Sequence, residues 1–171
     1  CLMSPSGSGK TTLLRILMGL EQADQGRILA DGQPQDMSSL TVSPVFQEDR
    51  LCESFSPIEN VSMCAGRSVK PSRIKWELSR LLPEECLNRP VSTLSGGMKR
   101  RVAVVRALLT PSHILLMDEP FTGMDDELKR NVISYIKEKQ DGRLLILSTH
   151  QEEDVELIGG ELVRLERCMG D

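Results

Sequence analysis

Aromatic residues and long hydrophobic runs are both scarce in this sequence. One Trp, one Tyr and three Phe are the only aromatic side chains among 171 residues. No apolar stretch approaches the roughly 18 residues needed to cross a bilayer, and the chain starts without a signal-peptide pattern. We therefore expect no membrane-spanning segment. If the protein functions at a membrane, we expect it to bind there through a partner protein.

Cysteine is present but without a pattern. The five cysteines are Cys1, Cys52, Cys64, Cys86 and Cys168, and no two of them form a C-x-x-C pair. An odd number of scattered thiols favours a reducing cytoplasm and gives no sign of a disulfide framework or a zinc site.

The charge balance is only weakly acidic, with a net charge of -4. Nucleic-acid-binding domains usually carry a basic excess, so the sequence predicts no nucleic-acid partner. One local basic cluster consists of Lys99, Arg100, Arg101 and Arg106. We interpret it as the solvated face of a helix.

Short apolar runs alternate with helical stretches along the chain. This alternation is typical of an α/β fold with a parallel sheet wrapped by helices. Strands are predicted at residues 1–3, 26–30, 42–46, 113–117, 144–148 and 161–166. Helices are predicted at 11–20, 72–82, 96–109, 125–139 and 152–157. The length fits a single domain, 1–171.

A change of character within that domain predicts an inserted lobe. Between residues 49 and 90, prolines punctuate short helical pieces and no long apolar strand occurs. We expect residues 49–90 to form a small helical subdomain, and residues 1–48 and 91–171 to form the catalytic core.

The stretch MSPSGSGKTTLL, residues 3–14, resembles the phosphate-loop pattern G-x-x-x-x-G-K-[ST]. Gly7 and Gly9 let the backbone approach an anion, and the start of the following helix attracts negative charge. Lys10 is predicted to reach the terminal phosphates, and the Thr11 hydroxyl to bind magnesium. The predicted nucleotide-binding residues of this loop are Ser4, Pro5, Ser6, Gly7, Ser8, Gly9, Lys10, Thr11 and Thr12.

Polar side chains follow three further predicted strands. Gln47 ends one strand, Asp118 and Glu119 end the next, and His150 ends a third. Ligands of parallel α/β sheets sit at the carboxyl ends of the strands, so we expect these side chains to converge on the loop. Paired carboxylates suit metal-assisted phosphate chemistry, with Asp118 on the metal and Glu119 on the attacking water. His113 precedes its strand and is interpreted as structural.

Five motifs in this order resemble the nucleotide-binding domains of ATP-binding cassette (ABC) proteins. They are SGSGKTT, VFQEDRL, LSGGM, ILLMDEPFTGMD and STH, and the resemblance covers about residues 1–166. The stretch LSGGMKRRVAVVRALL, residues 94–109, is the part that separates this family from other phosphate-loop ATPases. The resemblance implies a P-loop NTPase fold, with a mostly parallel sheet flanked by helices and a helical subdomain. It also implies ATP and Mg²⁺ as cofactors.

The same resemblance implies a dimer with ATP at its interface. A second copy of the domain would contact ATP through Ser95, Gly96 and Gly97 of its signature and through Asp125. Ser95 can also cap the helix that it precedes, which leaves N–H groups for an anion. In the family, Gln47 contacts magnesium or water, and His150 contacts the terminal phosphate.

Two departures from the family bear on how ATP would be held. Ser4 replaces a glycine, which would cost about 1 kcal/mol or more if that position needs a positive φ. Members also carry an antiparallel β region before the loop, with an aromatic residue that stacks on adenine. Nothing precedes Cys1 in the sequence, so we expect this region to be missing or truncated.

The sequence thus predicts the ATP-hydrolysing subunit of an ABC transporter. LSGGM and VFQEDRL resemble bacterial importers of the nitrate, sulfonate and taurine type. The family's partners would be integral-membrane permease subunits, reached at the cytoplasmic face of the membrane, and importers can also use a substrate-binding protein. Two alternatives stay open, namely a soluble ABC ATPase not coupled to transport and a nucleotide-binding remnant with impaired hydrolysis.

Overall fold

A five-stranded parallel sheet forms the centre of the protein. The computed structural model describes residues 1–5, 7–30, 32–36 and 39–165. The strand order is β4-β5-β6-β1-β7, and each neighbouring pair is parallel. The strands are β1 (Leu2–Met3), β4 (Val42–Val45), β5 (Ile114–Asp118), β6 (Leu144–Ser148) and β7 (Val163–Arg164). The predicted α/β class with a mostly parallel sheet is confirmed.

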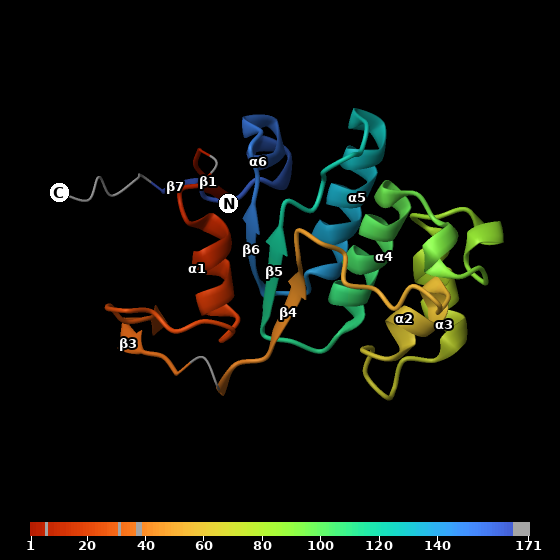
Figure 1. Ribbon diagram of the computed structural model, residues 1–171, viewed down its shortest axis with the longest axis horizontal. Helices are drawn as coiled ribbons and strands as arrows, with labels where there is room; N and C mark the ends of the chain where they lie inside the picture. Colours follow the sequence, from red (N-terminus) through yellow and green to blue (C-terminus); the bar gives the residue numbers. More distant parts are fainter. Residues whose placement is uncertain (6, 31, 37–38, 166–171) are drawn as a thin grey trace.

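Helices cover both faces of this sheet (Figure 1). The helix α1 (Lys10–Leu17) lies on one face, and α4 (Gly96–Leu109) and α5 (Asp126–Lys139) lie on the other. Side chains alternate between the faces of a strand. Accordingly Leu115 and Met117 of β5 join the core under α4 and α5, whereas Leu116 joins the smaller core under α1.

The caps of α4 and α5 explain where these helices begin. Ser95 Oγ accepts a hydrogen bond from the N–H of Met98 at 3.3 Å, and Asp125 Oδ1 accepts one from Leu128 at 2.9 Å. Such caps satisfy N–H groups that have no partner within the helix. The cap that the sequence predicts at Ser95 is therefore present. The remaining helix after β6 is α6 (Glu152–Ile158).

Residues 49–90 contain helices and no strand. The helices are α2 (Pro57–Ser62), α3 (Pro71–Ser79) and a 3-10 helix, Glu84–Cys86; a second 3-10 helix, Val91–Thr93, follows. Prolines at the first turns of α2 and α3 suit helix starts, where the missing N–H is not needed. Ile74 and Leu78 of α3 share one continuous core with Val104 of α4. These helices therefore pack directly on the sheet-bearing part.

One predicted strand does not belong to the main sheet. The strand predicted at 26–30 is the short β2 (Leu29–Ala30), which pairs antiparallel with β3 (Gln33–Pro34). All four residues are exposed, so no buried apolar face ties the hairpin to the core. No strand was predicted at residues 33–34, so β3 is an addition to the predicted elements. The strand predicted at 161–166 is shorter, and residue 166 lies outside the described residues.

Candidate functional site

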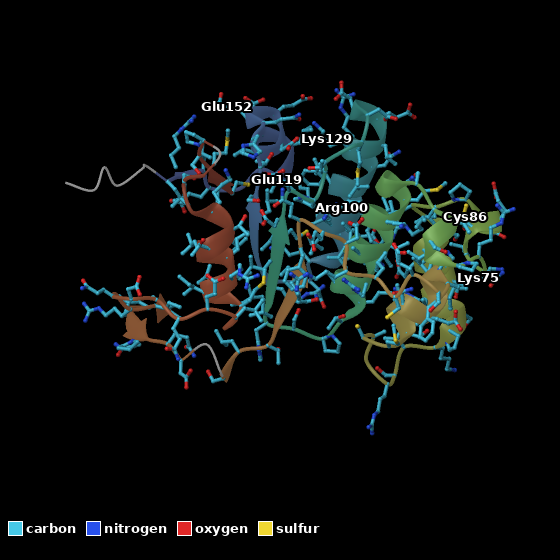
Figure 2. The ribbon with its side chains drawn as sticks, viewed as in Figure 1. Lys75, Cys86, Arg100, Glu119, Lys129 and Glu152 are labelled. Carbon is cyan, nitrogen blue, oxygen red and sulfur yellow. The ribbon has the colours of Figure 1, made fainter. Side chains whose placement is uncertain are left out.

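The carboxyl ends of the parallel strands meet at one edge of the sheet. A single pocket there is lined by the loop and first turn at Gly7–Thr12, by Gln47 after β4, by Glu119 after β5 and by His150 after β6. Figure 2 shows Glu119 at the end of β5, near Lys129 of α5. The structure thus brings together the loop and the side chains that were expected to converge on it.

The loop has the backbone shape that its glycines permit. Gly7 and Gly9 have φ of 77° and 90°, and Gly9 immediately precedes α1. Lys10 is buried, and its Nζ donates a hydrogen bond to the carbonyl of Ser4 at 2.7 Å. Ser4 is not among the non-glycine residues with positive φ, so the strain considered for this position does not arise. The predicted residue Ser6 lies outside the described residues.

Asp118 is held by two hydroxyl groups. It is buried at the end of β5, where its Oδ2 accepts a hydrogen bond from Thr11 Oγ1 at 3.0 Å. Its Oδ1 accepts one from Ser148 Oγ at 2.5 Å, and the same Oγ accepts the N–H of Glu119 at 3.0 Å. Ser148 thereby orients both carboxylate residues. Ser148 was not among the predicted site residues. Its place at the end of the apolar run LLILS could have identified it, because polar residues at the carboxyl ends of parallel strands face the ligand site.

Glu119 and His150 contact each other at the pocket. His150 Nε2 lies 2.5 Å from Glu119 Oε1, so the imidazole and the carboxylate are in direct contact. Glu119 also has φ of 50°, which is rare for a non-glycine residue and is typical of functional sites. The contact places the carboxylate and the imidazole side by side in the pocket that the loop lines.

The backbone beside Gln47 is anchored by Arg100 of α4. Its guanidinium donates hydrogen bonds to the carbonyls of Phe46 and Gln47, and its Nε lies 3.2 Å from Asp49 Oδ1. Burial raises the pKa of Asp49, and Arg100 acts in the opposite direction. The interpretation of Arg100 as part of a solvated helix face was wrong, since it is buried and donates to the carbonyls of Phe46 and Gln47.

The predicted signature residues form a second group. Gly97 packs against the carbonyl of Gly123, so that the start of α4 lies beside the turn that leads to Asp125. Among the described residues, none of Ser95, Gly96, Gly97 and Asp125 lines the pocket of the phosphate loop. The chain therefore presents the two groups separately.

The oxygen atoms of Thr11 and Asp118 fit a magnesium ion that arrives with phosphates. Within the part of the chain that the structure describes, no cluster of three His, Cys, Asp or Glu side chains could hold a metal alone. Magnesium usually takes one or two carboxylates plus substrate phosphates and waters. A hydroxyl and a carboxylate beside a phosphate loop match that preference.

The chain matches one known family and many of its members. Residues 1–122 match the family described as "ABC transporter". The chain is 39% identical to the sulfate/thiosulfate import ATP-binding protein CysA of Xylella fastidiosa, with 91% of the chain and 49% of that protein covered. It is 36% identical to the spermidine/putrescine import ATP-binding protein PotA of Protochlamydia amoebophila, covering 97% and 47% respectively. The chain thus spans about half the length of these relatives.

A solved structure shares the fold. The ATP-binding cassette MJ0796, a dimer in a post-hydrolysis state with ADP and Pi, superposes with a TM-score of 0.81 at 26% identity. The match covers 97% of this chain and 80% of that one. Over residues 1–5, 7–30, 32–36 and 39–165, no helix has the length and hydropathy needed to span a bilayer.

Proposed function

The chain belongs to the ABC transporter family, and on that premise we propose that it binds and hydrolyses ATP to drive a transporter's separate membrane subunits. The observation that carries the proposal is the pocket in which the phosphate loop faces Gln47, Glu119 and His150. The same proposal includes a catalytic core formed by residues 1–48 and 91–171 and a helical subdomain formed by residues 49–90.

ATP would bind with its phosphates against Gly7–Thr12. The N–H groups at the start of α1 and the ammonium of Lys10 would compensate the phosphate charge. Lys10 already donates to the Ser4 carbonyl and is buried, so it is held in place before a ligand arrives. Ser4, Pro5 and Ser6 would complete the loop, and Thr12 would face the phosphates from the first turn.

Thr11, Asp118 and Gln47 would hold Mg²⁺. The ion, when bound with ATP, neutralises charge on the phosphate oxygens. The protein would orient the Asp118 carboxylate for the ion, because Ser148 and Thr11 each donate a hydrogen bond to one of its oxygens.

Glu119 would act as the base that takes a proton from the attacking water. The water oxygen bonds to the terminal phosphorus, the bond to the leaving ADP oxygen breaks, and ADP and phosphate result. His150 contacts Glu119 Oε1 and would contact the terminal phosphate from the same pocket. Both groups lie within reach of one another, as a base and its partner require.

A second copy of the chain would complete the site. Ser95, Gly96 and Gly97 start a helix whose N–H groups suit an anion, and they lie outside the phosphate-loop pocket. With Asp125, they would contact the ATP bound by the partner copy. The dimeric, ADP-bound cassette with a TM-score of 0.81 supports this arrangement.

The helical segment 49–90 would meet integral-membrane permease subunits at the cytoplasmic face of the membrane. The relatives' names support an importer, and these importers can add a substrate-binding protein. Their names connect CysA with sulfate/thiosulfate import and PotA with spermidine/putrescine import, so the similarity to both does not identify one substrate for this chain.

Two variants test the proposal. Lys10→Ala should abolish binding of a fluorescent ATP analogue, because the loop loses its only buried cation. Glu119→Gln should bind ATP as the wild type does but hydrolyse it at least a hundredfold more slowly. Hydrolysis by Glu119→Gln at the wild-type rate would remove Glu119 from the role of base.

A further inference from the structure

Two charged side chains outside the proposed chemistry are buried beside it. Lys129 of α5 and Asp154 of α6 are 4% and 3% exposed, and Lys129 Nζ lies 3.1 Å from Asp154 Oδ1. We call them the Lys129–Asp154 pair. A buried ion pair is weak support for stability, because desolvation offsets most of the attraction. Stability alone therefore does not explain why this ion pair is buried beside the proposed catalytic residues.

The pair binds both residues that flank His150. Asp154 Oδ2 accepts a hydrogen bond from Thr149 Oγ1 at 2.5 Å, and Thr149 Oγ1 in turn accepts the N–H of Gln151 at 3.1 Å. Lys129 Nζ donates to Gln151 Oε1. Residues 149 and 151 are thus each held by one member of the pair.

His150 itself has few constraints of its own. Its side chain is 43% exposed, and its one polar side-chain contact among the described residues is with Glu119. An exposed side chain changes rotamer quickly unless its backbone and neighbours restrict it. The backbone at 149–151 must therefore supply the order that aims the imidazole at Glu119.

The ion pair, its partners and the proposed catalytic residues line one pocket. Glu119, His150, Lys129, Gln151 and Asp154 all line one pocket that adjoins the phosphate-loop pocket through Glu119 and His150. Lys129 lies one turn into α5, whose first residues follow the cap at Asp125. Figure 2 places Lys129 between α5 and α6, close to Glu119.

We propose that the Lys129–Asp154 pair positions His150 against Glu119 by clamping the two residues on either side of it. This inference deepens the proposed ATP hydrolysis and rests on it for its kinetic consequence. The pair does not touch the nucleotide in this scheme. It acts through Thr149 and Gln151 and sets the direction of the imidazole.

The first test is spectroscopic and needs no ATP hydrolysis. The chain has two histidines, so protein labelled with ¹⁵N-histidine gives signals from two imidazoles, His113 and His150. Lys129→Met should shift and broaden the His150 ring signals and leave those of His113 unchanged. His113 is an internal control, because it contacts Thr41 near the opposite ends of the strands.

The second test is kinetic. Lys129→Met should lower kcat about tenfold to a hundredfold, because misplacing a catalytic group by about 1 Å can cost that much. KM for ATP should change less than about twofold, since the phosphate loop is untouched. The matched control is the exposed pair Arg130–Glu153, one residue away on the same two helices at 3.8 Å. Arg130→Met and Glu153→Leu should leave both constants and both imidazole spectra unchanged.

A lone buried charge can unfold a protein, so a double variant separates positioning from folding. Lys129→Met with Asp154→Leu leaves no unpaired charge and should melt near the wild type. Its His150 signals should still be shifted and its kcat still low, because nothing holds residues 149 and 151. Wild-type His150 signals in this double variant would overturn the proposal. If the wild type binds ATP without hydrolysing it, the proposed function fails, and the imidazole spectra still decide the positioning role.

Discussion

Gly97 lies so close to Gly123 that a Cβ on Gly97 would be 3.3 Å from the Gly123 carbonyl oxygen. The first turn of α4 is thereby packed against the turn that leads into α5. Both segments are proposed to contact nucleotide on a second copy of the chain. The start of α4 and the turn at Gly123 are therefore close neighbours.

Gly97→Ala should therefore disturb the turn at Gly123, because a backbone oxygen has little room to yield. Gly96→Ala is the matched control, since a Cβ at Gly96 meets nothing within 4 Å. Gly96 is the first residue of α4, and alanine loses less backbone entropy on folding than glycine, so Gly96→Ala should raise the free energy of unfolding slightly. Gly97→Ala should gain less than Gly96→Ala or lose stability. Urea unfolding of both variants measures the difference, and equal gains would refute the crowding at Gly97.

The backbone of Glu119 stores strain at the proposed base. With φ of 50°, a residue with a Cβ is disfavoured by about 1 kcal/mol or more, whereas glycine is not. We expect Glu119→Gly to be more stable than Glu119→Ala by about 1 kcal/mol, although both lack the carboxylate. Thermal unfolding of the two variants tests this prediction. A less stable glycine variant would show that the residue is not strained.

Ser4→Gly should not tighten ATP binding. Ser4 is free of the positive φ at which glycine would relieve strain, and its carbonyl already accepts the Lys10 ammonium. The substitution also removes the contact between Ser4 Oγ and Ser8 Oγ. We expect an affinity for a fluorescent ATP analogue equal to the wild type or about twofold weaker. A severalfold gain in affinity would contradict the role of Ser4 described above.

Acid should weaken the contact between α3 and α5 in a defined pH range. Hydrogen bonds from Arg80, and then from Lys139, lower the pKa of Glu138 from 4.5 to about 2. Arg80 Nη2 lies 2.6 Å from Glu138 Oε2. A lowered pKa means that the folded state favours the ionised form, so the stabilisation is fully present above about pH 4.5 and is lost towards pH 2.

Glu138→Gln should consequently be less stable than the wild type at pH 7, and the difference should shrink as the pH falls from about 4.5 to 2. Because Glu138 is exposed, solvent screens the pair and the effect should be small. Urea unfolding at a series of pH values measures it, with Arg80→Met as the partner variant. A stability difference that persists unchanged at pH 2 would exclude this ion pair as its origin.

Much of the sheet could be predicted from local pattern. The runs at 42–46, 113–117 and 144–148 are apolar and flanked by helical stretches, and the structure has β4, β5 and β6 there within one residue at each end. Within the hairpin, β2 lies in the strand predicted at 26–30, whereas β3 (Gln33–Pro34) could not be predicted in the same way. Its residues are exposed, so the hydrophobic pattern that marks a strand is absent from them.

The burial of Arg100 and of the Lys129–Asp154 pair could not be predicted either. A charged side chain in a helix is usually solvated, and only the positions of its partners decide otherwise. Those partners are distant in sequence: Arg100 binds carbonyls at Phe46 and Gln47, and Lys129 meets Asp154.

The sequence by itself determined which residues could carry the chemistry and which way they face. The two-residue period of β5 puts Asp118 on the same face as Leu116, and both point towards α1. Only the tertiary structure decided what they meet. The register of β5 and β6 sets Asp118 opposite Ser148, and the docking of α1 brings Thr11 to the other carboxylate oxygen. Register and docking depend on how whole elements pack, and that information is not contained in any local stretch of the chain.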